Sequence, residues 1–388
     1  MDTIKGTAMN TPNPTRPPED AQDILLADIG GTHVRLALSS REFEQTHQSA
    51  FHAVEKYKAL DWPDFEGLVR AYLDNHSKTP QSLRAMAIAS AVRPEGKDGR
   101  IIRFDPSYKN NNWVIDRDAL SASFGGVPCT LALDTQAQFH TIRQFHKNTA
   151  PHDLYECLHQ GGSLSGHCGQ NDTALMVSVG TGLGHAYGAC QSPQSGGDGD
   201  VRPTFGGHMV PACATTEQQD AMHSIAQSLH GKRHVIFEDI VSGRGFFGLY
   251  SFACHRKAME PAYNDVFTLM ADGLDPDNQE VQSAARLFCE FLGLYVNVVA
   301  TSIHAFGGVY LIGSILRRLR EVGLFDEETV KKSMWLDMVQ VVDRAWREAP
   351  IYLGRAQHLT LHGLCDMARQ HGDGAAVSEA SGALEARG

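Results

Sequence analysis

The chain of 388 residues is 42% hydrophobic, which is enough for two domains with a large buried core. Its formal net charge of −11 argues against a general binder of nucleic acid or of anionic membranes, because both present negative charge to a protein. No apolar run is long enough to span a bilayer, so we expect neither nucleic acid nor a membrane as a partner.

The two ends of the chain are expected to lie outside the folded part. Residues 1–21 are rich in Thr, Pro and Asn and lack the apolar core of a targeting signal, so we expect a disordered tail. Residues 372–388 are similarly biased and are expected to form a flexible tail. The eight cysteines include no CxxC pair, which favours reduced thiols in a cytoplasmic protein.

The most informative stretch is an apolar strand that ends in a carboxylate, two glycines and a hydroxyl. Ile24–Leu38 is expected to form a hairpin of two apolar strands. Its tip presents backbone N–H groups, a threonine hydroxyl and a carboxylate, which is the chemistry needed to hold a phosphate with Mg²⁺. The residues concerned are Ala27, Asp28, Ile29, Gly30, Gly31 and Thr32.

Further elements are expected before residue 150. Phe65–Asn75 has apolar residues at helical spacing, and Arg84–Ala89 reads as a buried strand. Cys129–Asp134 is another such strand, followed by a helix over Gln136–Phe145. Asp134 therefore falls at the carboxyl end of a strand, where α/β folds place their chemistry.

The segment over residues 146–168 concentrates histidine and cysteine. Either a structural zinc site or a polar loop would account for this composition. The spacing matches no standard zinc pattern, and Gly, Ser and Asn surround these side chains, which favours the loop. The residues are His146, His152, Cys157, His159, His167 and Cys168.

A second glycine-rich loop follows the apolar strand Thr173–Ser178. The loop residues are Gly180, Thr181, Gly182 and Gly184. Two such loops in separate halves of the chain suggest one nucleotide held between two domains.

A third glycine cluster lies beyond a long helix that begins near Val281 and shows apolar residues at helical spacing. The helix gives way to a strand over Val309–Ile312. The glycines around this strand are Gly307, Gly308 and Gly313. Either they cap the helix and turn the chain, or they form a flat slot for an adenine ring.

In this order, the pieces resemble the bacterial glucokinase family, the non-zinc branch of the superfamily of sugar kinases, heat-shock proteins and actin. The match runs from about Leu25 to Ala368, and it rests on colinear order rather than on any one motif. The zinc-bearing branch has a cysteine cluster after its Gly-His, whereas Met209–Cys213 holds one cysteine. The motifs that carry the resemblance are Ala27–Thr32, Asp134, Gly180–Gly184, Gly206–His208, Glu238–Gly245 with Leu249 and Tyr250, Asn297, and Phe306–Gly313.

This resemblance implies an α/β protein made of two ribonuclease-H-like (actin-like ATPase) domains around a central cleft. The chain would return to the small domain near its end. The small domain would comprise residues 22–140 with 356–371, and the large domain residues 141–355.

The resemblance also implies an ATP-dependent hexose kinase, with D-glucose as the first candidate substrate. Asp134 would accept the proton of the sugar's 6-hydroxyl, and Asp28 would hold Mg²⁺ through water. The glycine loops would bind the phosphates of ATP, with Arg35 adding charge nearby. His208 and Glu238 would form hydrogen bonds to sugar hydroxyls. Whether the chain forms a homodimer is left open.

Three residues depart from the family pattern near this site. Leu133 stands where Asn is usual, Phe205 where Glu is usual, and His33 where Asn is usual. The first two remove groups expected to bind sugar hydroxyls, and each lost hydrogen bond should cost about 0.5–1.5 kcal/mol, or up to roughly 3 kcal/mol for the charged Glu. Glucose binding would then weaken by about two orders of magnitude or more. The alternatives are a kinase for a different sugar and a catalytically weak sugar- or nucleotide-binding sensor.

Overall fold

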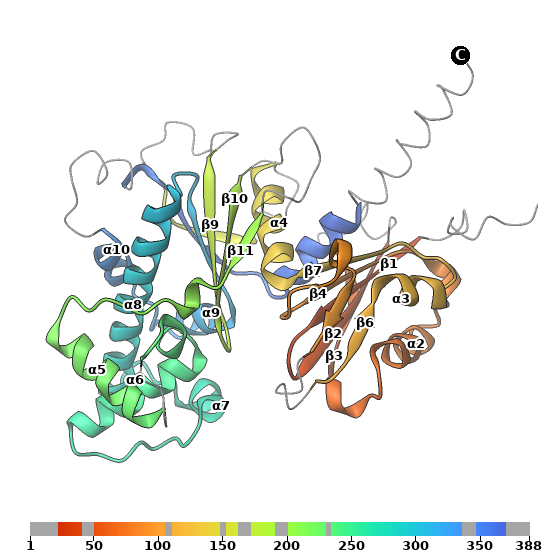
Figure 1. The fold of residues 1–388 in the computed structure, drawn as a ribbon. Helices are drawn as coiled ribbons and strands as arrows, with labels where there is room; N and C mark the ends of the chain where they lie inside the picture. Colours follow the sequence, from red (N-terminus) through yellow and green to blue (C-terminus); the bar gives the residue numbers. More distant parts are fainter. Residues whose placement is uncertain are drawn as a thin grey trace, which may run out of the picture. The chain divides into compact units, whose positions relative to one another are not determined.

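The computed structural model describes residues 22–40, 50–104, 111–147, 153–161, 172–190, 201–229, 234–335 and 347–369. The chain divides into two compact units, each with its own sheet (Figure 1). The first unit comprises Met1–Gln138 with Thr360–Gly388, and the second Phe139–Leu359.

The first unit contains a five-stranded sheet with the order β3-β2-β1-β4-β7. β2 pairs antiparallel with both β1 and β3, whereas β4 runs parallel to β1 and β7 runs parallel to β4. These strands are β1 (Asp23–Ile29), β2 (His33–Ser40), β3 (His52–Lys58), β4 (Leu83–Ser90) and β7 (Cys129–Leu133). A separate ribbon is formed by β5 (Ile101–Arg103) and β6 (Val114–Asp116).

Both faces of this sheet are covered. Because side chains alternate along a strand, Leu25 and Ala27 pack in the core that α2 (Phe65–Asn75) and α3 (Arg117–Ser123) share. Ile24 and Leu26 face the other way, into a core completed by the helix over 359–369. The helix α2 begins where the Asp64 carboxylate accepts the N–H of Gly67 at 2.7 Å.

The second unit contains a six-stranded sheet with the order β11-β10-β9-β12-β13-β8. Its first five strands repeat the pairing of the first unit, with β9, β10 and β11 antiparallel and β12 and β13 parallel to β9 and to each other. The strands are β8 (Tyr155–His159), β9 (Thr173–Val179), β10 (Leu183–Ala189), β11 (Arg202–Thr204), β12 (Val309–Ile312) and β13 (Ile351–Gly354).

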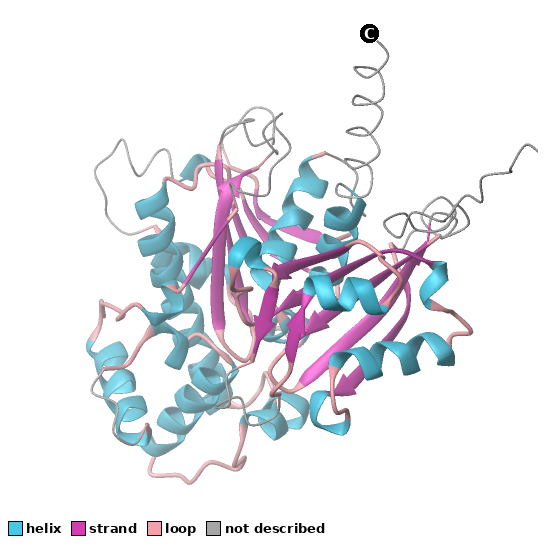
Figure 2. Cartoon of the chain, turned by 45° about the vertical axis from the view of Figure 1, so that its right-hand side comes forward, coloured by secondary structure: helices cyan, strands magenta, loops and turns pink. Residues whose placement is uncertain are grey.

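Helices flank the strands of the second unit (Figure 2). One face of the sheet, on which Leu175 and Val177 lie, shares a core with the long helix α8 (Gln279–Ile303) and with α6 (Gly243–Arg256). Phe139 of α4 (Asp134–His146) packs in the core on the other face. The remaining helices of this unit are α5 (Thr216–Ser228), α7 (Val266–Thr268), α9 (Ser314–Glu321) and α10 (Glu327–Met334).

The expected α/β class is confirmed, and the predicted hairpin, helices and strands occur with small shifts at their ends. One boundary matters for the chemistry. Asp134 opens α4 instead of ending β7, and its Oδ1 accepts the N–H of Thr135 at 2.6 Å. Carboxylates are favoured at this end of a helix because backbone N–H groups are unpaired there.

The expectation that no apolar run could span a bilayer is wrong for α8. This helix of 25 residues has a mean hydropathy of 1.3 over its most apolar window and is long enough to cross a membrane. However, 67% of that window is buried inside the unit, where Phe288, Phe291 and Tyr295 are fully inaccessible. The apolar surface of α8 is therefore used in the core.

Among the cysteines that the structure describes, all but Cys190 follow the expectation. Cys190 is disulfide-bonded, so the expectation of reduced thiols is wrong there, because spacing along a chain does not report which thiols meet in the fold. The free thiols among the described residues are Cys129, Cys157, Cys213, Cys254, Cys289 and Cys365.

Candidate active site

The tip of the β1–β2 hairpin is closed by its own backbone. The N–H of Gly30 donates to the carbonyl of His33 at 2.9 Å, so this expected phosphate donor is engaged in the turn. The side chain of Asn111 holds the Gly30 carbonyl at 3.2 Å. Gly31 and Thr32 form the outermost part of the tip, where Thr32 is exposed. Gly31 and Thr32 are thus the better placed of the tip residues to meet an anion.

Asp28 lies on β1 just before the tip. Its carboxylate forms an ion pair with Arg35 of β2 at 3.2 Å, and its side chain is 17% exposed. Burial raises the pKa of Asp28, although Arg35 acts in the opposite direction through its charge and its hydrogen bond. The carboxylate is therefore held within the first unit with water on one side.

Asp134 lies at the same edge of the sheet as Asp28. Parallel pairing places the carboxyl ends of β1, β4 and β7 together, and Asp134 follows β7 directly. Burial, and next the charge of Asp28, raise the pKa of Asp134 to about 7, against the lowering effect of the Thr135 N–H. Two neighbouring carboxylates thus disfavour each other's ionisation. A carboxylate that titrates near neutral pH can act as a general base.

Cations line the same face of the sheet. Arg35 lies opposite Lys56 of β3 and His33 lies opposite Lys58, so the four side chains share a face with Asp28. Burial lowers the pKa of His33, and the charges of Lys56, Arg35 and Lys58 lower it further. His33 is therefore neutral at physiological pH, with cations around it. Lys56 and Lys58 belong to no motif, and only their alternation along a strand marks them in the sequence.

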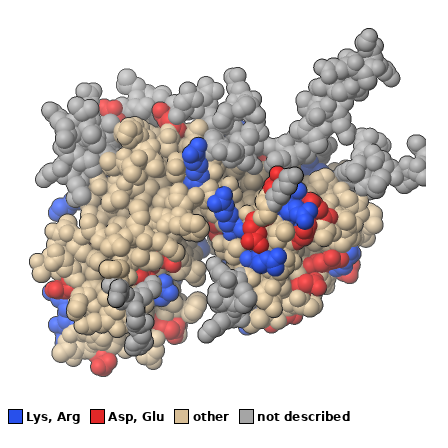
Figure 3. Space-filling view, in the orientation of Figure 1, with Lys and Arg blue, Asp and Glu red and all other residues tan. Residues whose placement is uncertain are grey.

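Charged side chains of both signs are intermixed on the surface of the first unit. Over the first unit, Lys and Arg side chains lie close to Asp and Glu side chains (Figure 3). Arg100 pairs with Asp116 and Asp118, and Arg103 pairs with Glu95. An acidic protein can thus keep a local cationic face beside the hairpin, because exposed charges are screened beyond about 8 Å.

Leu133, expected near the sugar, is the last residue of β7 and is partly buried. Its N–H donates to Oε1 of Gln136 at 3.1 Å, and its side chain offers no polar atom. A sugar hydroxyl would therefore find no hydrogen-bond partner on this residue.

In the second unit, the loop between β9 and β10 is built like the first hairpin. The N–H of Gly180 donates to the carbonyl of Gly182 at 2.9 Å, and the N–H of Gly243 donates to the carbonyl of Gly180 at 2.9 Å. The loop is therefore fixed to the start of α6. Thr181 is exposed at its tip.

Glu238, expected as a sugar ligand, is tied to this loop. Its Oε2 accepts the N–H of Leu183 at 3.0 Å and lies where a Cβ on Gly182 would be only 2.8 Å away. The guanidinium of Arg244 is 3.9 Å from the other carboxylate oxygen. Glu238 is thus fixed to the β9–β10 loop through Oε2, with Oε1 outside that hydrogen bond.

Phe205 and His208 lie on the turn after β11. The ring of Phe205 is 77% exposed, and its centroid is 6.0 Å from that of His208, which is also exposed. The turn is closed by the His208 N–H, which donates to the Phe205 carbonyl at 2.9 Å. Phe205 therefore does not fill the interior of the second unit, and it presents an aromatic face beside His208.

The third glycine cluster does not cap α8. The left-handed cap is His304, with φ of 52°, and Gly307 and Gly308 follow it on the way into β12. Gly313 has φ of +119°, and a Cβ there would lie 2.1 Å from the carbonyl of Val179. Glycine is thus required at 313, directly beside the strand that feeds the second loop.

No group of three or more metal-ligating side chains occurs in the described part of the chain. Of the residues considered for zinc, His146 bonds the hydroxyl of Tyr310 and His159 bonds the carbonyl of Arg347. His152, His167 and Cys168 lie outside the described residues.

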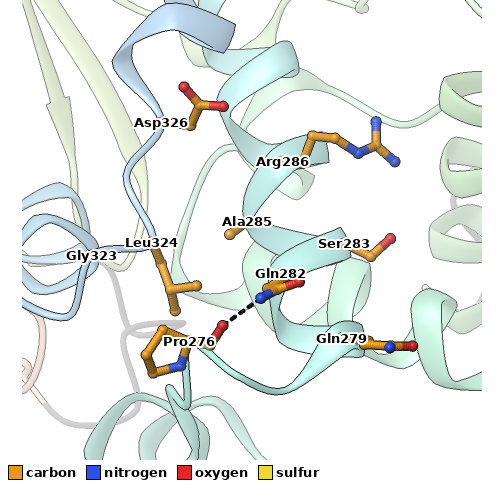
Figure 4. Close-up of a pocket in the computed structure, with 9 residues that line it drawn as sticks. All are labelled: Pro276, Gln279, Gln282, Ser283, Ala285, Arg286, Gly323, Leu324 and Asp326. Atoms are coloured by element: carbon orange, nitrogen blue, oxygen red, sulfur yellow. Dashed lines mark hydrogen bonds between the residues drawn. The ribbon is translucent and has the colours of Figure 1, made fainter.

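Two cavities lie away from these residues. The larger, of about 460 Å³, is at the start of α8 (Figure 4), and the other, of about 340 Å³, is beside α9. In the larger one, Arg286 is already paired with Glu217 and Glu290, and Asp326 caps α10. Its other lining residues are Pro276, Gln279, Gln282, Ser283, Ala285, Gly323 and Leu324. Neither cavity includes a predicted site residue.

Comparison with known proteins identifies the family. The glucokinase family model matches residues 25–371. A glucokinase-like protein of Xylella fastidiosa is 27% identical over 311 residues, covering 80% of this chain and 85% of that protein. A glucokinase of Pectobacterium atrosepticum is 28% identical over 305 residues, covering 77% and 83%.

The fold agrees with this assignment. The crystal structure of a Balamuthia mandrillaris glucokinase in complex with glucose superimposes with a TM-score of 0.69 at 22% identity, covering 90% of this chain and 94% of that chain. Such an enzyme is expected to have glycine loops on equivalent hairpins and a titratable carboxylate, and Asp134 supplies that carboxylate at the start of α4, directly after β7. The chain belongs to the glucokinase family and is a sugar kinase with two actin-like ATPase domains.

Proposed function

We propose that this chain transfers the γ-phosphoryl group of ATP to the 6-hydroxyl of a hexose, with D-glucose as the first candidate. The observation that carries this proposal is the position and pKa of Asp134, beside Asp28 and at the same sheet edge as the first glycine hairpin. Membership of the glucokinase family supports the same reaction. A cytoplasmic location is expected for an enzyme that uses ATP.

Asp134 is the general base in this proposal. With a pKa of about 7, a large fraction of its carboxyl groups is ionised at neutral pH and the rest is protonated. As the hydroxyl oxygen attacks the γ-phosphorus and the bond to the leaving ADP breaks, the hydroxyl proton passes to the Asp134 carboxylate. The Thr135 N–H holds one carboxylate oxygen, which fixes the direction of the other.

The donor set also fits a magnesium ion. Mg²⁺ in phosphoryl-transfer enzymes is held by one or two carboxylates together with water and phosphate oxygens. Asp28, through water, would hold it in the first unit, where the mutual repulsion of Asp28 and Asp134 favours a nearby divalent cation. When bound, the ion would neutralise negative charge on the transferred phosphate.

Each glycine loop offers groups that would bind nucleotide phosphates. Gly31 and Thr32 in the first unit, and Thr181 and Gly182 in the second, would approach the phosphates. Lys56 and Lys58 would add positive charge on the face that carries Asp28. Gly307, Gly308 and Gly313 would lie along the adenine.

The identity of the acceptor sugar is less determined than that of the phosphoryl donor. His208 and Oε1 of Glu238 remain able to bind sugar hydroxyls, whereas Leu133 and Phe205 cannot bind them by hydrogen bonds. The exposed ring of Phe205 suits the apolar face of a sugar ring or an apolar substituent on it. A hexose other than glucose is therefore the second candidate substrate.

A substrate screen tests this function. The purified chain is mixed with Mg-ATP and each of a panel of hexoses, and ADP release is followed with Asp134→Asn as the inactive control. We expect turnover with at least one hexose. Absence of turnover with every hexose at about tens of millimolar would overturn the kinase proposal. Calorimetric binding of sugar or ATP without turnover would instead identify a sensor.

A further inference from the structure

The core of the second unit contains a buried histidine that belongs to no motif. His185 of β10 is 4% exposed and points into the core formed with α8. Burial lowers its pKa to about 4, so the imidazole is neutral at physiological pH. A neutral imidazole has one donor and one acceptor nitrogen, and both need partners in an apolar core.

Both nitrogens have partners. Nδ1 bonds the hydroxyl of Tyr295 on α8, and Nε2 bonds the hydroxyl of Thr204 at the end of β11. Either tautomer satisfies both bonds, because each hydroxyl can donate or accept. Residues from three elements, far apart in the sequence, therefore meet in one buried polar chain.

Thr204, at one end of this hydrogen-bonded group, holds the turn that carries Phe205 and His208. Thr204 Oγ1 accepts the N–H of Gly206 at 3.0 Å. The backbone of Gly206 lies so close to the imidazole that a Cβ there would be 1.9 Å from Cε1 of His185 and 3.0 Å from the Tyr295 hydroxyl. The glycine turn is thus seated directly on His185 and Tyr295.

The other end reaches the remaining sugar ligand and the second phosphate loop. Burial raises the pKa of Tyr295, and the charge of Glu238 raises it further. The ring of Phe237 packs edge-on against that of Tyr295, with the ring centroids 5.0 Å apart. Glu238 in turn accepts the N–H of Leu183, two residues before His185. The buried group therefore contacts the turn directly and lies within electrostatic range of Glu238.

We propose that Thr204, His185 and Tyr295 are positioning residues for the acceptor sugar, which set the place of the His208 turn relative to Glu238. This inference rests on the proposed hexose kinase activity and names the residues that organise its acceptor side. With leucine at 133 and phenylalanine at 205, fewer direct sugar contacts remain, so the precision of the remaining two matters more.

The test compares two tyrosines that each lose a buried hydroxyl. Tyr295→Phe removes the bond to His185, and Tyr155→Phe removes a bond to Thr141 elsewhere in the same unit. Both variants should lose thermal stability to a similar degree. We expect Tyr295→Phe alone to raise the KM for the best hexose about tenfold, with the KM for Mg-ATP changed less than about twofold.

Thr204 supplies the rescue experiment. Thr204→Val removes the hydroxyl while keeping the shape of the side chain, whereas Thr204→Ser keeps the hydroxyl and removes the methyl group. We expect the valine variant to raise the hexose KM as Tyr295→Phe does, and the serine variant to keep the wild-type value within about twofold.

The outcomes separate this inference from the proposed function. If the wild-type chain phosphorylates a hexose and Tyr295→Phe behaves like Tyr155→Phe, the positioning role is wrong and the kinase proposal stands. Equal hexose KM values for Thr204→Val and Thr204→Ser would also overturn it. If the wild-type chain phosphorylates no hexose, both proposals fail.

Discussion

Asp134 occupies a position that favours the reaction and disfavours the fold. Its pKa is about 7 in the folded chain, against 3.8 for an ordinary aspartate. Below about pH 4 the carboxyl is protonated in both the folded and the unfolded state, so it does not reduce the free energy of unfolding. Between these values the unfolded state ionises first, and stability falls as the pH rises. Above about pH 7 the full cost is present.

Asp134→Asn should therefore abolish turnover and stabilise the protein. The full shift corresponds to roughly 4 kcal/mol, and the partial exposure of Asp134 reduces the expected gain to about 2 kcal/mol at pH 8. At about pH 4 the two proteins should unfold alike. Urea unfolding at both pH values measures this, and an Asn variant less stable than wild type at pH 8 would contradict the assignment.

The same pKa predicts the pH dependence of the rate. Only the ionised carboxylate can accept the hydroxyl proton, so kcat/KM for the hexose should rise with pH and level off above an apparent pKa near 7. Steady-state kinetics at constant ionic strength measure the profile. A rate that does not change between about pH 5.5 and 7.5 would mean that another group is the base.

Phe205 offers a direct test of what the acceptor site has lost. Phe205→Glu restores the carboxylate usual in the family on an exposed position, and should lower the KM for glucose about tenfold if glucose is a substrate. Val210→Glu, another exposed apolar position nearby, is the control for added charge. An unchanged or higher KM for Phe205→Glu would show that the aromatic ring belongs to a site rebuilt for a different sugar.

At the scale of elements, the pair β2 and β3 supplies positive charge that no single motif contains. A double variant of Lys56→Gln and Lys58→Gln should raise the KM for Mg-ATP about threefold at low salt, because two cations are lost from the face of Asp28. The difference should shrink at about 0.5 M salt. Lys332→Gln on α10 is the control, and an equal effect from it would rule out a local role.

The elements themselves were largely predictable, because their signals are local. Apolar alternation and helical spacing predict β1, β2, β4, α2 and α8, and the glycine motifs predict where the loops fall. The start of α4 at Asp134 was missed, because a strand end and a helix start share the same residue types. The hydrogen bonds that link Thr204, His185 and Tyr295 could not be predicted, because Thr204 and Tyr295 are 19 and 110 residues away from His185 in the sequence.

At the scale of the whole molecule, the two sheets share one strand order. The strand orders β3-β2-β1-β4-β7 and β11-β10-β9-β12-β13 have the same parallel and antiparallel pairings. One glycine loop joins β1 to β2, and the other joins β9 to β10 at the equivalent place. The repeated architecture explains why the two glycine loops arise at matching places.

The division of the chain also has a consequence for how it is made. The second unit is one continuous stretch, Phe139–Leu359, whereas the first needs a segment from each side of it. The core on one face of the first sheet includes Leu361, Leu364 and Cys365, all fully buried, from the helix over 359–369. During synthesis, the second unit can fold as soon as it leaves the ribosome. The first-made strands must keep an apolar face uncovered until residues 359–369 emerge, so the part of the chain made first is completed after the second unit.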